Sequence, residues 1–442
     1  MPSSDKSHIH VAVIGGGITG VMLALGLLKR GVNYTLYERA PAFTEIGAGI
    51  GFSPNAERAL KVVDPEVYRI FKQVATTTEV EEYFQWVDGY RTNEIAARLL
   101  IGVDAFQFGR RSDFLEAWSK LIAKDNAKFN KELITLSQKD DGKVSLGFKD
   151  GTVEEADLVV GCDGINSRVR RLMLGESNPA SYPSYTNKYC YRALVPMDKA
   201  REVLGAERAV DKHGSLNRLM YIGPNAHCMS YPVAKDQFLN VLLVISDPNP
   251  WRSEDGKHTA PETKADAIRA FAEWRPKIRA LVDLLPEKLQ KWAIFDLFEN
   301  PVPYYHDGSV AVAGDAAHAA GPHLGSGAGF GVEDALVLAS LLEAANTKAS
   351  GQNQKTKVDL CHDALIAYNN VRYNRTQWLI RATREACALF HWQDEAVGND
   401  FDKFLSEIGK RYHQIWDNDI DGMVEGALNE FDEVLGGRGA KT

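Results

Sequence analysis

Hydrophobic residues near the start of the chain form two strand-like runs separated by a helix-like pattern. An apolar run at 11–14 has the length of a buried strand, apolar residues recur with helical spacing over 18–29, and a second short run covers 34–37. Glycines lie between the first run and the helix, and an acidic residue follows the second run. This order predicts a βαβ unit of the dinucleotide-binding kind.

The glycines of this unit have the spacing G-x-G-x-x-G. Gly15 permits a tight turn, Gly17 lets the backbone approach a pyrophosphate, and Gly20 lets helix and strand pack closely. The N–H groups of the first helical turn are then free to face phosphates. Glu38 is placed to accept hydrogen bonds from a ribose, and its charge disfavours a 2′-phosphate. The unit therefore predicts a site for FAD or NAD rather than NADP.

The pattern changes twice along the rest of the chain. Up to about residue 180 it predicts helices from Ser53-Pro54 and over 111–124, and strands at 130–138, 143–149, 152–154 and 157–160. From about 181 to 300, aromatic residues and prolines increase, and strands are predicted at 188–195, 226–232 and 239–245. A buried strand at 309–313 follows, then helices over 332–345 and 359–392, a loose loop at 347–357, a helical C-terminal region and a frayed tail from Gly436.

Composition fits an enzyme of ordinary globular type. The chain has 442 residues, 45% of them hydrophobic and 25% charged, which is enough for two or three packed units. A net charge of −8 argues against nucleic acid or an anionic membrane surface as a partner. Five scattered cysteines without C-x-x-C or metal spacing predict no metal site and suit a reducing compartment. Neither a signal peptide nor a membrane span is evident, so we expect a cytoplasmic protein.

Two later segments carry further candidate chemistry. Asp163-Gly164 follows an apolar run and precedes several arginines, which on its own is equally consistent with a plain turn and a charged surface. Asp315 follows the 309–313 strand directly, where a carboxylate can accept from a ribityl hydroxyl. Glycines then alternate from 325 to 331 and lead into a helix, so their N–H groups are expected to face an anion or a polar ring edge. A flexible linker is the alternative, but linkers usually carry more polar residues.

The set GGGITG…E, GRRSDF, GCDGINSRVR and GDAAHAAGPHLGSGAGFGVEDA resembles the fingerprints of the single-component, class A flavin-dependent aromatic hydroxylases, the para-hydroxybenzoate hydroxylase group. The fingerprints occur in the family's order, and the resemblance covers roughly residues 9–420. The segments EIGAGIGFSPNA, YRALVPMD, YIGPNAH, SYPV and IWDNDID are most similar to salicylate hydroxylases and to fungal polyketide hydroxylases such as 3-methylorcinaldehyde hydroxylase. The resemblance implies FAD as cofactor, NADH or NADPH as co-substrate, and O2 and a phenol as substrates.

Pattern and resemblance together predict an α/β fold with a Rossmann-like FAD-binding domain of the glutathione reductase type. A mixed β-sheet substrate domain is expected to be inserted into it, with helices at the C-terminus. The predicted boundaries are 8–180 and 301–346 for the FAD-binding domain, 181–300 for the substrate domain and 347–442 for the helical region. No second G-x-G-x-x-G follows a strand, in keeping with a family that has no separate NAD(P)H domain.

The resemblance assigns FAD contacts residue by residue. Gly15, Gly17 and Gly20 are implied at the pyrophosphate and Glu38 at the adenosine ribose. Arg111 matches an arginine near the phosphates or ribityl chain, and Asp315 matches the ribityl-binding aspartate. Asp163 and Gly164 match a motif that serves both FAD and NAD(P)H. Backbone near the flavin ring is implied at Gly51, Gly327 and Ala328.

Three residues are implied at the substrate. Arg192 and Tyr231 match a pair that holds a phenolate in fungal dearomatising hydroxylases, and His323 matches a histidine between flavin and substrate. A fixed cation favours the ionised phenol and orients it, and Tyr231 can donate to the same oxygen. The structural alternatives are a strand-surface salt bridge for Arg192, a core aromatic for Tyr231 and a satisfied histidine for His323. Aromatic residues that could line the cavity or simply pack in the core are Trp86, Tyr191 and Tyr221.

The resulting expectation is an NAD(P)H-consuming aromatic monooxygenase that acts through a flavin C4a-hydroperoxide. The substrate is either a salicylate-like acid, which loses CO2, or an alkylated phenol, which loses aromaticity. Bacterial salicylate hydroxylases tend to have phenylalanine at the position of Tyr231, so the tyrosine favours the fungal branch. Two alternatives stay open: an oxidase that forms H2O2 without NAD(P)H, and a degenerate flavoprotein that only binds, whose damaged motifs are not seen here.

Overall fold

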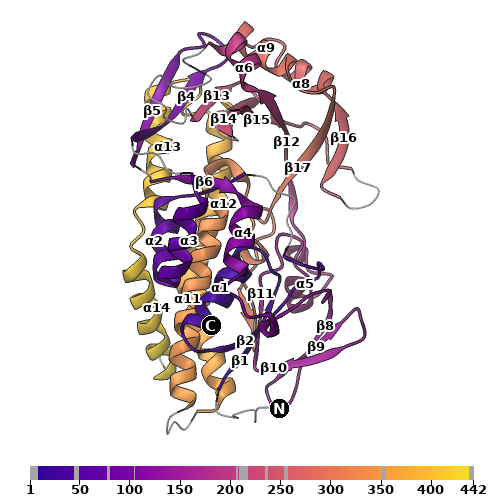
Figure 1. Ribbon diagram of the computed structural model, residues 1–442, viewed down its shortest axis with the longest axis vertical. Coiled ribbons are helices and arrows are strands. Elements are labelled where there is room, and N and C mark those ends of the chain that lie inside the picture. The colour runs from indigo at the N-terminus through magenta and orange to yellow at the C-terminus, as the bar shows by residue number, and fades with distance from the viewer. Residues whose placement is uncertain are drawn as a thin grey trace.

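The computed structural model describes residues 8–43, 49–76, 80–103, 105–205, 208, 218–233, 237–252, 257–350 and 355–437. The molecule is elongated, with one large sheet at one end and a helix-covered sheet in the other half (Figure 1). None of the described helices is both long enough and apolar enough to span a membrane.

The first large sheet has six strands in the order β18-β19-β11-β1-β2-β7. Five of them are parallel neighbours, in the order β19, β11, β1, β2 and β7, and only β18 runs antiparallel. Their apolar runs are buried because helices cover parallel sheets. The strands are β1 (His10–Ile14), β2 (Asn33–Tyr37), β7 (Ala127–Lys128), β11 (Leu158–Gly161), β18 (His306–Asp307) and β19 (Val310–Val312). The predicted βαβ unit and the return of the chain at 309–313 are confirmed.

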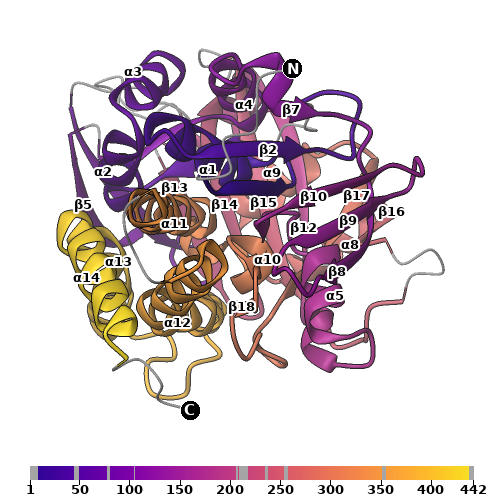
Figure 2. The same cartoon turned by 90° about the horizontal axis from the view of Figure 1, so that it is seen from below.

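Long helices pack on this sheet, and Figure 2 shows α11 and α12 side by side with α14 next to them. The helices are α1 (Ile18–Lys29), α2 (Pro54–Val63), α3 (Pro65–Val74), α4 (Arg111–Ser119), α5 (Arg168–Leu174), α10 (Asp315–His318), α11 (Gly327–Ala349), α12 (Lys357–Phe390), α13 (Phe401–Trp416) and α14 (Ile420–Leu435). The helical C-terminal region is confirmed, and residues 351–354 and 438–442 of the predicted loop and tail lie outside the described part.

Two helix predictions need correction. The helix expected over 111–124 ends at Ser119. The helix expected from residue 332 starts at Gly327, because its glycines are packed inside helical turns. A Cβ on Gly329 would lie 2.9 Å from the Cβ of Ala56, and one on Gly331 only 2.2 Å from Thr19 Oγ1. These two glycines therefore permit close helix packing, rather than presenting N–H groups to a ligand.

The second large sheet has eight strands in the order β16-β17-β12-β15-β14-β13-β4-β5. It is mixed as expected, because β4 pairs with β13 in parallel while the other neighbours are antiparallel. The strands are β4 (Glu81–Asp88), β5 (Ile95–Val103), β12 (Ser184–Pro196), β13 (Arg218–Gly223), β14 (Ala226–Val233), β15 (Phe238–Ser246), β16 (Thr259–Thr263) and β17 (Lys288–Asp296). The predicted boundary at 180 missed β4 and β5, which leave the first segment to complete this sheet.

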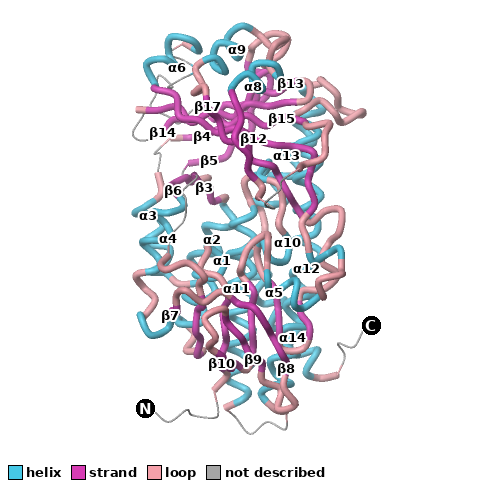
Figure 3. The backbone as a smooth tube through the Cα atoms, turned by 90° about the vertical axis from the view of Figure 1, so that its right-hand side faces the viewer, coloured by secondary structure: helices cyan, strands magenta, loops and turns pink. Residues whose placement is uncertain are grey.

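Short helices cover the outer face of the second sheet, as Figure 3 shows at the top of the view: α6 (Met197–Leu204), α8 (Lys264–Ala270) and α9 (Pro276–Asp283). Between the two halves lies the antiparallel pair of β3 (Gly49–Phe52) and β6 (Gln107–Arg110). A small three-stranded sheet sits at the opposite end, made of β8 (Leu133–Gln138), β9 (Val144–Phe148) and β10 (Val153–Ala156).

Candidate active site

A cavity of about 320 Å³ lies where the first sheet, the β3–β6 pair and the inner face of the second sheet meet. Ten of the predicted site residues line it: Gly17, Gly51, Arg111, Gly164, Arg192, Tyr231, Asp315, His323, Gly327 and Ala328. The remaining four, Gly15, Gly20, Glu38 and Asp163, are not among its lining residues.

The glycine turn forms the base of the cavity. Gly15 has φ +103°, and a Cβ there would lie 2.6 Å from the carbonyl oxygen of Cys162. A Cβ on Gly20 would lie 1.9 Å from Gly15 O, so strand and helix can touch only through glycine. The first N–H groups of α1 have no partner inside the helix. Because Gly17 and Arg111 both line the cavity here, this end suits a phosphate-bearing group.

Two acidic residues hold backbone around this turn. Glu38 Oε2 accepts from Gly16 N at 2.6 Å, and Oε1 accepts from Ala40 N at 2.7 Å. Asp163 accepts from Ser167 Oγ at 2.5 Å and from the first N–H groups of α5. The side chain of Asp163 therefore orders the start of α5, and its contact with FAD or NAD(P)H stays a prediction. In this motif Gly164 is the residue that lines the cavity.

Asp315 is presented by a turn that a buried charge cluster holds in place. Gly314 has φ +61°, and its N–H donates to Asp334 Oδ2 at 2.9 Å. Arg372, fully buried, donates to Asp334 Oδ1 and to Glu333 Oε2, each at 2.7 Å. Burial alone would raise the pKa of Asp334, but the charges of His318 and Arg372 hold it below its ordinary value. An ionised Asp334 thus anchors the turn that places Asp315 in the cavity.

Alternate residues of the second sheet form the opposite wall, as the period of a strand requires. Arg192 on β12 is in register with Leu242 on β15, which is in register with Met229 on β14. Tyr231 lies two residues beyond Met229 and also lines the cavity. Among the described residues Arg192 makes no hydrogen bond or ion pair, which does not fit the strand-surface salt bridge considered as its alternative.

Tyr231 lies where β14 meets the β3–β6 pair. Its hydroxyl is 3.2 Å from the position that a Cβ would take on Gly49, and its ring stacks on that of Phe108. Burial raises the pKa of Tyr231, and the charge of Arg192 opposes that rise. The residue therefore presents a protonated hydroxyl, a hydrogen-bond donor, within electrostatic range of Arg192.

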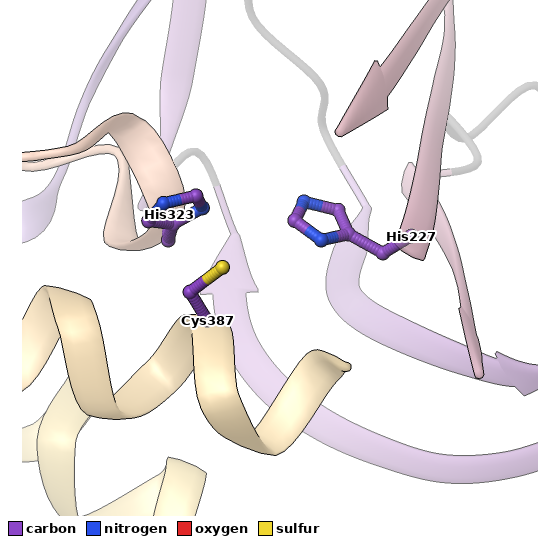
Figure 4. Close-up of side chains that lie close together, drawn as sticks. All are labelled: His227, His323 and Cys387. Atoms are coloured by element: carbon purple, nitrogen blue, oxygen red, sulfur yellow. The ribbon is translucent and has the colours of Figure 1, made fainter. Parts of the chain in front are cut away.

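His323 and His227 line the cavity, and Cys387 lies close to both of them outside its lining (Figure 4). Possible ligand atoms of these three residues lie within 4.8 Å of one another, and all three are buried. Burial, together with the nearby charges of Lys188 and Arg384, lowers the pKa of His323 to about 3. Because the same cations disfavour a metal ion, we assign none to this group. His323 Nδ1 is buried and has no hydrogen-bond partner in the described part of the chain.

Sequence reasoning missed most of the apolar lining. Phe84, Phe106, Phe108, Met220, Met229 and Tyr412 all line the cavity. For Phe84, Phe108, Met220 and Met229 the available signal was alternation within short strands, but using it required knowing that these strands reach the site. His227 was left among the structural histidines, although it alternates with Met229 and Tyr231 on β14. Trp86, Tyr191 and Tyr221 are buried in the core and do not line the cavity, which confirms their packing role.

Known proteins with this sequence pattern bind FAD. A model of the FAD binding domain family matches residues 115–364. The FAD-dependent monooxygenase pigN of Monascus ruber is 44% identical, over 97% of this chain and 98% of its own. The salicylate hydroxylase asL1 of Sarocladium schorii is 38% identical, over 97% and 92% of the two chains. A solved salicylate hydroxylase substrate complex has a TM-score of 0.82 at 28% identity, covering 96% of this chain and 98% of that chain.

The cavity fits the cofactor that these comparisons imply. A glycine turn with open N–H groups and Arg111 suits the pyrophosphate, Asp315 suits a hydroxylated chain, and Gly327 and Ala328 leave backbone open beside it. FAD is the cofactor, and O2 and reduced nicotinamide are the co-substrates of such an enzyme. The named relatives favour oxygen insertion over the oxidase alternative. The chain belongs to the FAD-dependent monooxygenases that carry this FAD-binding domain.

Proposed function

We propose that this monooxygenase hydroxylates a phenol bound between the flavin ring and the second sheet, with Arg192 holding the phenolate oxygen. The observation that carries the proposal is an arginine on β12 that lines the cavity and has no partner among the residues that the structure describes. An always-charged guanidinium favours the ionised phenol and forks around its oxygen. Tyr231 donates to the same oxygen, so the two residues fix the ring's orientation.

Bound FAD supplies the reduced ring that activates O2 for insertion into the substrate. The chain's own residues orient the substrate and keep water out of the cavity. The phenyl rings of Phe84, Phe106 and Phe108 and the side chains of Met220 and Met229 make the substrate end of the cavity largely apolar. A dry cavity protects a reactive oxygen species from decay. The ionised ring, held by Arg192, is electron-rich at carbons ortho and para to its oxygen, where oxygen is inserted.

Among phenols, the lining favours an alkylated one over a salicylate-like acid. Of the described residues that the second sheet contributes to the cavity, only Arg192 carries a full positive charge. One cation matches one phenolate oxygen, whereas a salicylate dianion carries two negative charges and calls for a second cation. The similarity to salicylate hydroxylases keeps the acid as the competing substrate class. All five cysteines are free thiols, which supports our proposal that the enzyme works in the cytoplasm.

A substrate panel tests the proposal. Alkylated resorcinol aldehydes, simple phenols and salicylate are each mixed with enzyme, FAD and NADH or NADPH under ¹⁸O2. We expect alkylated phenols to stimulate nicotinamide oxidation and to yield a product carrying one ¹⁸O atom. Turnover of salicylate to catechol would overturn the preference for an alkylated phenol, whereas the proposal that the substrate is a phenol would stand. Nicotinamide-independent H2O2 without labelled product would overturn the function.

A further inference from the structure

A row of hydrogen bonds leads from the substrate cavity to the surface. His227 lines the cavity, and its Nδ1 lies 2.8 Å from Nε2 of His391. His391 Nδ1 lies 2.9 Å from Ser246 Oγ, and Gln393 Nε2 lies 3.2 Å from the same hydroxyl. The two imidazoles are buried, Ser246 is half-buried and Gln393 is exposed. The row therefore spans the wall between cavity and solvent.

The row joins elements that are far apart in sequence. His227 belongs to β14, Ser246 ends β15, and His391 directly follows α12. Because Nδ1 of His227 is engaged by His391, Nε2 is the ring atom available to a molecule in the cavity. His227 also lies on the same strand face as Met229, whose row across the sheet contains Arg192. A substrate oxygen near Arg192 thus shares one wall of the cavity with His227.

Both imidazoles are neutral. Burial lowers the pKa of His227 and of His391 well below the ordinary value, and the facing charge of Lys188 and the ring of His323 lower both further. A neutral imidazole has one donor nitrogen and one acceptor nitrogen. Two such rings in series can therefore each take up one proton and release another at the same time, so that neither ring becomes charged.

We propose that His227, His391 and Ser246 form a proton path that carries the phenol proton from the cavity to the surface. This inference rests on the proposed function. The substrate O–H gives its proton to His227 Nε2 while the Nδ1 proton of His227 moves to His391 Nε2. The Nδ1 proton of His391 moves to Ser246 Oγ, whose own proton leaves to water. Each ring gains one N–H and loses one, and the negative charge stays on the substrate oxygen beside Arg192.

The neighbours of the path explain why it works through neutral rings. Lys188, Arg384 and His323 approach it from β12, α12 and the loop before α11, and a positive imidazolium would be repelled by the two cations. Cys387 Sγ lies 3.9 Å from His391 Nε2, but burial raises the pKa of this thiol to about 12. Cys387 therefore stays protonated, and it provides a matched control next to the path.

The test compares His391→Gln with Cys387→Ala in the FAD-loaded enzyme. Glutamine can hydrogen-bond but cannot exchange protons between two nitrogens. We expect His391→Gln to lower turnover of a phenol about 10²-fold at pH 6.5, the usual size of a lost proton-transfer group. Its rate should rise about tenfold per pH unit, as the free phenol ionises, and approach the wild-type rate at high pH. Cys387→Ala should keep the wild-type rate and pH profile.

A stopped-flow measurement separates this role from that of Arg192. When phenol binds to oxidised enzyme with a pH indicator present, wild type should release a proton rapidly. His391→Gln should release the same amount more slowly, whereas Arg192→Gln should release less. Should His391→Gln not retain FAD, Ser246→Ala serves as the second variant, with a smaller slowing because water can replace the hydroxyl.

The outcomes are distinguishable. If wild type hydroxylates phenols and His391→Gln matches it in rate and pH profile, the proton path is wrong and the proposed function stands. If Cys387→Ala is slowed to the same extent as His391→Gln, the effect is one of packing and the path is again wrong. If wild type oxygenates no phenol, the proposed function fails and the path with it.

Discussion

The ring of Tyr231 stacks on the ring of Phe108, with centroids 5.6 Å apart and planes inclined by 22°. The guanidinium of Arg218 lies 4.4 Å from the centroid of the same Phe108 ring, and Arg218 forms a buried ion pair with Glu82. The stack links β14 to the β3–β6 pair beside the FAD-binding half. The Tyr231 hydroxyl is thereby held by packing, independently of any hydrogen bond.

Tyr231→Phe should keep this stack and remove only the hydroxyl. We expect kcat/KM to fall roughly tenfold, about 1.4 kcal/mol, as for the loss of one neutral hydrogen bond. Phe108→Ala should cost more, because it removes the support of the ring. Steady-state kinetics with the best phenol measure both. A larger loss in Tyr231→Phe than in Phe108→Ala would show that the stack does not position the hydroxyl.

Asp315→Ala should weaken FAD binding. If Asp315 accepts a hydrogen bond from the ribityl chain, its loss leaves a hydroxyl unpaired and costs roughly 1–3 kcal/mol of affinity. Titration of apoprotein with FAD, followed by flavin fluorescence, gives the dissociation constant. Asp283→Ala, at the exposed end of α9, is the control and should bind FAD as wild type does. Equal affinities for Asp315→Ala and the control would remove Asp315 from the site.

Arg372→Met should destabilise the fold as well as the turn before Asp315. It removes the buried cation that Asp334 and Glu333 share and leaves them with His318 and Arg375; breaking a buried ion pair typically costs about 3–5 kcal/mol. The exposed pair of Arg69 and Glu66 provides the contrast, and Arg69→Met should leave the melting temperature unchanged. Thermal melting of the two variants makes the comparison. A melting temperature for Arg372→Met equal to that of wild type would contradict the anchoring role of the cluster.

His323 predicts a pH dependence of stability. Its pKa is about 3 in the fold and about 6.5 when unfolded, so unfolding takes up a proton between these two values. Stability is therefore lost as the pH falls through this window, by roughly 1.4 kcal/mol per pH unit for one such group. His323→Asn removes the group that takes up this proton. The unfolding free energy of the variant should therefore fall less steeply than that of wild type as the pH is lowered from 6 to 4.5. Equal slopes for variant and wild type would show that His323 protonates freely in the fold.

The sequence predicted local features better than long-range ones. The strand, turn and helix around Gly15 follow from periodicity and glycine spacing, and the structure confirms them. The membership of β4 in the second sheet depends on pairing with β13, more than a hundred residues away, and no local pattern encodes that pairing. The helix from Gly327 was placed too late because its glycines resemble a loop until their packing partners, Ala56 and Thr19, are known.

In the candidate site, too, some residues could be predicted from local sequence, whereas others depend on long-range contacts. Arg192 and Tyr231 were singled out together, and the structure places both on one wall of the cavity, with β15 between their strands. Asp163 was assigned to the cofactors through the family resemblance alone, because an Asp-Gly turn after a strand looks the same whether its carboxylate faces a cofactor or a helix end. The path through His227 and His391 could not be predicted, since it depends on where α12 ends relative to β14.

The most direct test of the account is Arg192→Gln. FAD binding should survive, because Arg192 lies on the second sheet and not at the glycine turn. Labelled product should fall about 10²-fold or more at neutral pH, the size expected for one positioned electrostatic contact, and should recover as the pH rises and the substrate ionises unaided. Mass spectrometry of ¹⁸O-labelled product in wild type and variant decides the matter. Hydroxylation by Arg192→Gln at the wild-type rate at neutral pH would contradict the account and make His323 the next candidate for holding the substrate.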